Sequence, residues 1–219
     1  MTLYLTYIMR RLFSLAAFVL MGISGFAQTQ TINLPKPNMQ RQTLSVMETF
    51  QQRKSVREYS PESLSEQDLS DLLWAACGVN RENGNLTAPT AMNRQEIRLY
   101  VVYEKGVSLY DPKTHTLTMV ADGDHRGLIA GSQAFAKEAP ISLLMVGDLD
   151  KFGSKSTHAQ TMVAVDAGIV CQNIDIFCAA AGLATVPRAT MDVKALQSLL
   201  GLNENQIPLL NNPVGYPKR

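Results

Sequence analysis

Apolar residues recur at helical spacing in several stretches of the chain. The longest such stretch, residues 158–181, carries almost no charge beyond Asp166 and Asp175. A helix that is apolar around most of its circumference is buried in its own domain or in a dimer interface, so we predict one of these positions for it. Shorter helical patterns lie at residues 44–50, 65–77, 124–137 and 193–200.

Other stretches have the composition of β-strands. Residues 97–103 are rich in β-branched and aromatic residues. Two shorter strand-like pieces follow, 107–110 and 116–120, and a proline-containing turn separates them. Residues 141–146 form a continuous apolar run, which indicates a buried central strand, and a further strand is predicted at 207–210. Helices around a modest, mostly antiparallel sheet make this an α+β chain.

The N-terminal segment has the pattern of an export signal. Residues 1–27 contain no acidic residue, place Arg10 and Arg11 before a short apolar run, and end in Gly25-Phe26-Ala27. This pattern predicts a signal peptide cleaved near Ala27, with Met1 or Met9 as the start, and a periplasmic or secreted product. The run is too short for a stable membrane span. Residues 28–40 are predicted to be an extended arm and residues 41–219 a single domain.

Composition narrows the possible partners. The chain has 20 basic and 19 acidic residues, so its charge gives no general attraction for nucleic acid. The three histidines are isolated and no metal-ligand spacing occurs, so no metal site is predicted. Cys77, Cys171 and Cys178 are an odd set without a disulfide pattern, and we interpret them as buried thiols rather than a redox pair.

The segment from Arg53 to Arg57 is the first candidate for binding chemistry. Arg53, Ser55 and Arg57 alternate, so in an extended segment they would face one side. Two guanidiniums and a hydroxyl form a clamp for phosphate or carboxylate. From the spacing alone, the solvated basic end of a helix is the favoured interpretation.

Three further segments resolve this ambiguity, because together with the first they resemble the nitroreductase family. The loop of residues 88–95 resembles the family's second signature. Asp166-Ala167-Gly168 with residues 182–187 resembles the third, and the ending of residues 213–219 resembles the fourth. The resemblance implies the nitroreductase-like fold and a homodimer that binds FMN at the subunit interface, with the long helix near that interface.

The resemblance also assigns roles to individual residues. It places Arg53, Ser55 and Arg57 with Lys218 and Arg219 at the FMN phosphate and ribityl chain. Asn93 and Gln95 would bind the pyrimidine edge, and the backbone at Ala189 and Thr190 would approach flavin N5. The loop residues that would reach the ring from the other subunit are Pro89, Thr90 and Ala91.

The implied activity is flavin-mediated, so no side chain is predicted to act as a catalytic nucleophile. Hydride would pass through flavin N5 to or from a small nitro, quinone or conjugated substrate. Two alternatives remain: an oxidase or dehydrogenase of the same fold that does not use NAD(P)H, and a flavin-binding protein without turnover. Export favours an electron donor other than NAD(P)H. Arg188, where relatives often have Glu or Gly nearby, is expected to bind an anionic substrate or to form a surface ion pair.

Overall fold

The computed structural model describes residues 30–218 of the 219-residue chain. The predicted signal peptide and Arg219 lie outside the described residues. The described residues from Thr31 onward form one compact unit. Its strands are β1 (Thr31–Asn33), β2 (Ile97–Tyr103), β3 (Gly106–Asp111), β4 (Thr116–Asp122), β5 (Ile141–Asp148), β6 (Ala184–Thr185) and β7 (Gln206–Gly215). Its helices are α2 (Val46–Gln52), α3 (Glu66–Cys77), η1 (Ala91–Asn93), α4 (Arg126–Ala130), η2 (Ala134–Glu138), α5 (Leu149–Phe152), α6 (Thr157–Ala181) and α7 (Val193–Leu199).

The strands form one antiparallel sheet in the order β1-β4-β3-β2-β5-β7-β6. Strand β5 lies inside the sheet, and its residues are all buried because β2 and β7 pair with its two edges and both of its faces pack into cores. Successive side chains of a strand point to opposite faces. Accordingly Leu143 packs into the core on one face and Leu144 into the core on the other. The predicted α+β fold with a central antiparallel sheet is confirmed.

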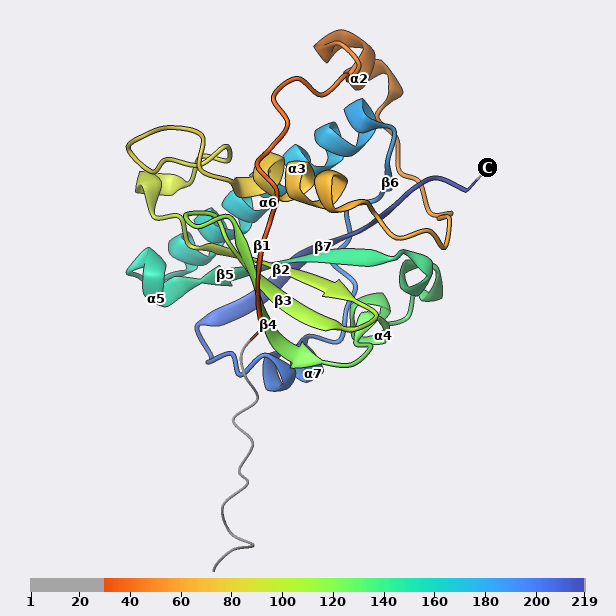
Figure 1. Cartoon of the computed structure of the whole chain (residues 1–219). Helices are drawn as coiled ribbons and strands as arrows, with labels where there is room; N and C mark the ends of the chain where they lie inside the picture. The colour runs from red at the N-terminus through yellow and green to blue at the C-terminus, as the bar shows by residue number, and fades with distance from the viewer. Residues whose placement is uncertain (1–29, 219) are drawn as a thin grey trace, which may run out of the picture. The chain divides into compact units, whose positions relative to one another are not determined.

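Helices cover both faces of this sheet (Figure 1). On one face α3 and α6 pack against each other, and α6 also contacts β5 and β7. On the other face α4 and α7 contribute Ile129 and Leu196 to a smaller core. Helix α6 has the length and composition of a membrane span. Its contacts with the sheet and with α3 explain that composition, since a helix packed into a core is apolar for the same reason.

The structure corrects two predicted elements. Residues 124–137 are not one helix, because Gly131 ends α4 with φ of 55° and the chain continues into the separate 3-10 helix η2. The last strand is longer than predicted: β7 runs to Gly215, since it pairs with β5 along nearly its whole length. The three cysteines are free and buried, as predicted.

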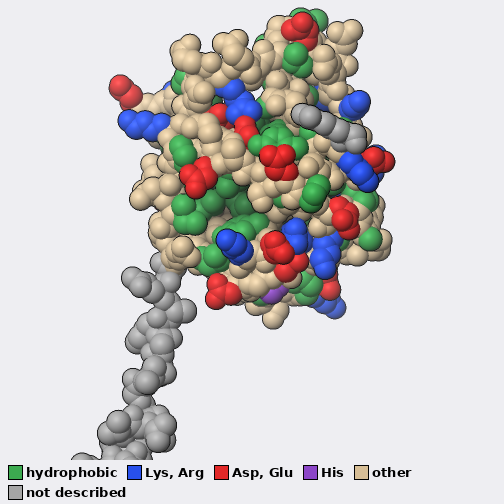
Figure 2. Space-filling view, turned by 45° about the vertical axis from the view of Figure 1, so that its right-hand side comes forward, with side chains coloured by type: hydrophobic (Ala, Val, Ile, Leu, Met, Phe, Trp, Pro, Cys, Tyr) green, Lys and Arg blue, Asp and Glu red, His purple; other side chains and the backbone are tan. Residues whose placement is uncertain are grey.

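The N-terminal arm joins the sheet instead of lying apart from it. Thr31–Asn33 pairs with β4 at the sheet edge, and Leu34 N–H then donates to the carbonyl of His115. On the face drawn in Figure 2, Lys and Arg side chains lie among Asp and Glu side chains rather than in one broad area. The net charge of +1 likewise gives no general attraction for an anion, so binding one requires a local cluster.

Candidate functional site

The segment around Arg57 is joined by backbone contacts to two distant parts of the chain. Val56 N–H donates to the carbonyl of Thr185 at 2.9 Å, which places the segment beside the end of α6 and β6. Tyr59 forms an antiparallel bridge with Pro217, and Lys218 N–H donates to the carbonyl of Glu58 at 3.3 Å. The structure thus brings together the first, third and fourth of the four sequence segments.

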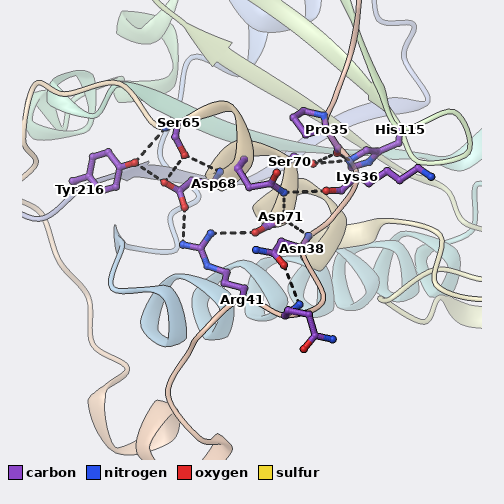
Figure 3. A network of polar contacts seen from close by, with 12 residues as sticks. Pro35, Lys36, Asn38, Arg41, Ser65, Asp68, Ser70, Asp71, His115 and Tyr216 are labelled. Carbon is purple, nitrogen blue, oxygen red and sulfur yellow. Dashed lines mark hydrogen bonds and ion pairs between the residues drawn. The ribbon is translucent and has the colours of Figure 1, made fainter.

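The C-terminal tail is held in this position by Tyr216 (Figure 3). Its hydroxyl donates to Asp68 Oδ2 at 2.5 Å and accepts from Ser65 N–H at 3.2 Å, at the N-terminus of α3. Arg41 pairs with the other oxygen of Asp68 at 2.6 Å and with Asp71 at 3.1 Å. These hydrogen bonds and the Arg41 charge outweigh the cost of burial and lower the pKa of Asp68.

A cavity of about 240 Å³ lies beside Arg57. Its lining contains no acidic residue and consists of Arg57, Gln133, Phe135, Val186, Pro187, Arg188, Ala189 and Thr190. The guanidinium carbons of Arg57 and Arg188 lie 5.8 Å and 5.4 Å from the centroid of the Phe135 ring. Both distances are within the range of cation–π contacts. The cavity is therefore bordered by two positive charges that flank one aromatic ring.

The surface ion pair considered for Arg188 is wrong, since the residue is only 6% exposed. Its guanidinium donates to four neutral oxygens: Gln133 Oε1, Ile129 O, Asn211 Oδ1 and Ala130 O, at 2.7–3.1 Å. Burial lowers the pKa of Arg188, and within the described chain no carboxylate lies at ion-pair distance from it. Because arginine stays protonated in proteins, this charge is buried without a counter-anion.

A buried polar network lies in the second half of α6, near the clamp segment (residues 53–57). Asn212 on β7 donates to Asp175 Oδ1 at 2.8 Å and accepts from the Cys171 thiol at 3.0 Å. Burial raises the pKa of Asp175 to about 6, and the nearby positive charge of Arg53 opposes this shift. The charge of Arg53 thus acts on a carboxylate of α6, whereas Arg57 lines the cavity.

The loop of residues 89–95 lies at a different place in the same chain. Ala91 N–H donates to Asp166 Oδ2 at 2.8 Å, in the first half of α6. The helix advances by about 14 Å from Asp166 to Asp175, the carboxylate near Arg53, and by about 22 Å to Ala181, at about 1.5 Å per residue. One chain therefore does not bring Asn93 and Gln95 to the clamp segment, and their side chains instead hydrogen-bond within the loop region.

Sequence reasoning missed several residues of the site. Gln133 and Phe135 fall in the stretch predicted as one continuous helix, so nothing marked them as cavity residues. Arg188 is buried between two exposed residues, Pro187 and Ala189, and no sequence pattern at these positions predicted its burial. Glu96, directly after the loop, was also passed over, although a charged residue that opens an apolar strand was a detectable signal.

The long helix packed on a central antiparallel sheet is the α+β nitroreductase-like fold. The chain belongs to the nitroreductase family, whose model matches residues 50–216. It is 29% identical over 198 residues to a protein of Methanocaldococcus jannaschii provisionally named a nitroreductase, a match that covers 84% of this chain and 96% of that protein.

Solved structures support the same assignment. A provisionally named nitroreductase from Ralstonia eutropha is 33% identical with a TM-score of 0.80, covering 86% of this chain and 90% of that one. The NADPH:FMN oxidoreductase of Vibrio harveyi is 20% identical with a TM-score of 0.61, covering 80% of this chain and 69% of that one. At that identity the second match shows a shared fold alone.

Proposed function

We propose that this protein is an FMN-dependent oxidoreductase that transfers hydride to or from a small nitro, quinone or conjugated substrate. The observation that carries the proposal is the cavity beside Arg57, where two guanidiniums border a space with no acidic lining. A buried positive charge without a counter-anion favours an anionic ligand there. The near-zero net charge of the chain gives no general preference for anions over the rest of the surface.

The residues present fit FMN. Arg57, with the tail residue Lys218 brought close by the Glu58 contact, offers cationic donors of the kind that hold a phosphate. The backbone of Ala189 and Thr190 borders the cavity, as the family resemblance requires. When bound, FMN would supply the hydride chemistry, while the chain would bind and orient it and stabilise negative charge in the cavity through Arg57 and Arg188.

We also propose that the active form is a homodimer. The cavity of about 240 Å³ is smaller than the roughly 300–1,000 Å³ typical of ligand pockets, so one chain supplies only part of a site. The loop of residues 89–95 contacts the first half of α6 at Asp166, so a second copy would be needed to bring such a loop to the clamp. Exposed apolar residues on α2 and α6 suit such an interface, namely Val46, Met47, Phe50 and Val165.

The first experiment is to purify the chain from Gln28 onward and record its visible spectrum with and without added FMN. Flavin bands that bleach with dithionite support the proposal, and their absence after reconstitution would overturn it. Bleaching by NADH or NADPH would identify the donor. Reduction by dithionite alone would favour a different donor, as proposed for an exported protein. Cell fractionation then tests export itself.

Residue-level support comes from FMN titrations of variants. Arg57→Gln is expected to weaken FMN binding by about 10- to 100-fold, since one charged hydrogen bond contributes roughly 1.5–3 kcal/mol. Lys54→Gln is the matched control, because Lys54 is a neighbouring cation that is exposed and outside the cavity lining. Equal changes in FMN affinity for the two variants would show that Arg57 is not part of the proposed FMN site.

The dimer is tested separately by light scattering. Phe50→Glu places a charge on an apolar residue of α2 that is 59% exposed in the single chain. We expect it to yield monomers that fold but bind FMN weakly. A monomeric wild-type protein that binds FMN with full affinity would overturn the shared-site proposal.

A further inference from the structure

Glu96 is a buried carboxyl without a hydrogen-bond donor. It follows the loop of residues 89–95 and is 0% exposed, although its backbone carbonyl accepts from Asp148 N–H at 3.1 Å. Neither side-chain oxygen receives an N–H or O–H bond within the described chain. A buried ionised carboxylate in that condition is strongly destabilising, so this side chain requires an explanation.

The explanation lies in its neighbour on α6. The Glu96 carboxyl faces that of Asp166, and the two can form a hydrogen bond only if one of them is protonated. Burial and the Asp166 charge raise the pKa of Glu96 to about 7, while Lys151 on α5 opposes the shift. Glu96 is therefore the group that keeps the proton in this pair below neutral pH.

The loop that this pair supports has an unfavourable backbone. Met92, Asn93 and Gln95 have φ of 53°, 52° and 51°, the left-handed region that only Asn among them tolerates readily. Such a conformation persists only where surrounding contacts hold it. Asp166 accepts from Ala91 N–H, and Lys151 donates its ammonium to the carbonyl of Gln95.

We propose that Glu96 and Asp166 are positioning residues that share one proton and thereby hold the loop of residues 89–95 in its ligand-binding conformation. Glu96 donates to Asp166, which fixes the Asp166 carboxylate as the acceptor for Ala91 N–H. When the proton leaves for solvent, two buried negative charges face each other and the loop loses this support. The link to FMN rests on the proposed function; the effect on the loop does not.

The test measures FMN affinity and loop order between pH 6.5 and 8.5. For wild type, the FMN dissociation constant should rise above neutral pH, by at most about tenfold per pH unit. Hydrogen exchange of a peptide covering residues 88–95, corrected for intrinsic rates, should accelerate over the same range. Glu96→Gln keeps a donor toward Asp166 at all pH values, so both profiles should become flat. Glu104→Gln, an exposed glutamate in the β2–β3 turn, should behave as wild type.

Asp166→Asn provides a second variant if Glu96→Gln folds poorly. Its amide can accept from Ala91 and donate to an ionised Glu96, so the loop should stay protected at alkaline pH. Persistence of the wild-type pH profile in both variants, or a wild-type loop whose protection does not depend on pH, would overturn the proposal. Absence of FMN binding with the expected exchange profiles would instead overturn the proposed function alone.

Discussion

The hydroxyl of Tyr216 donates to Oδ2 of Asp68 at 2.5 Å and so ties the C-terminal tail to the start of α3. The other oxygen of the same carboxylate pairs with Arg41 at 2.6 Å. One aspartate thus holds the tail and Arg41, which directly follows the N-terminal arm and is separated from the tail by most of the chain. Since the tail carries Lys218 to the clamp segment, this contact contributes to the geometry of the site.

Replacing Tyr216 by Phe should therefore affect both stability and ligand binding. We expect the free energy of unfolding in urea to fall by about 1–2 kcal/mol, because a hydrogen bond to a charged acceptor is lost. FMN affinity should fall as well, since the tail loses its anchor. Tyr103→Phe removes a comparable hydroxyl, bonded to Ser108 at 2.9 Å in the β2–β3 hairpin, and should leave FMN affinity unchanged. Equal FMN affinity in both variants would contradict the role of the tail.

Asp175 gives a prediction about pH and stability. Its folded pKa of about 6 lies above the ordinary value of 3.8, so the folded chain holds the proton more tightly than the unfolded chain. Stability contributed by this site therefore falls as pH rises from 3.8 to 6 and stays lower above it. Asp175→Asn should be more stable than wild type at pH 7.5 by at most about 3 kcal/mol and similar to it near pH 4. Urea unfolding of wild type and Asp175→Asn at the two pH values checks this. An equal difference in stability between the two proteins at both pH values would contradict it.

Arg188 should be structurally indispensable. Arg188→Gln leaves the carbonyls of Ile129 and Ala130 and the Asn211 amide without their donor in a buried region. We expect a loss of about 2–4 kcal/mol in the free energy of unfolding, measured in urea. Lys155→Gln breaks only an exposed ion pair with Asp150 and should cost less than about 1 kcal/mol. Similar losses in the two variants would show that the Arg188 contacts contribute little.

Gly147 and Gly168 make a matched pair for packing around α6. A Cβ added at Gly147 would lie 2.2 Å from Val163 Cγ1 and 2.9 Å from Leu209 Cδ1, so Gly147→Ala should cost about 1–3 kcal/mol. A Cβ at Gly168 meets no atom of the described chain within 4 Å, and Gly168→Ala should stabilise the isolated chain by about 1 kcal/mol through helix propensity. Thermal unfolding measures both. A loss at Gly168 that appears only at dimer-forming concentrations would show that a second copy packs there.

Much of the fold is predictable from the sequence because its elements follow local rules. Ser65 accepts from Asp68 N–H and caps α3 at the start of the helical pattern predicted over residues 65–77, and β2 spans the residues that its composition marked. The helix predicted over residues 124–137 fails at Gly131. A positive φ there breaks the periodicity, and apolar spacing alone did not reveal it.

The sequence by itself determined the family and most helices and strands, since the motifs and patterns that mark them depend on neighbours a few positions apart; the clamp residues stay a prediction. Tertiary structure alone decided that Arg188 is buried, that Glu96 faces Asp166, and that the loop and the clamp meet different parts of α6. Each of these facts depends on which segments pack together across long separations in the chain. The cost of burying a charge follows from that packing and leaves no periodic trace in the sequence.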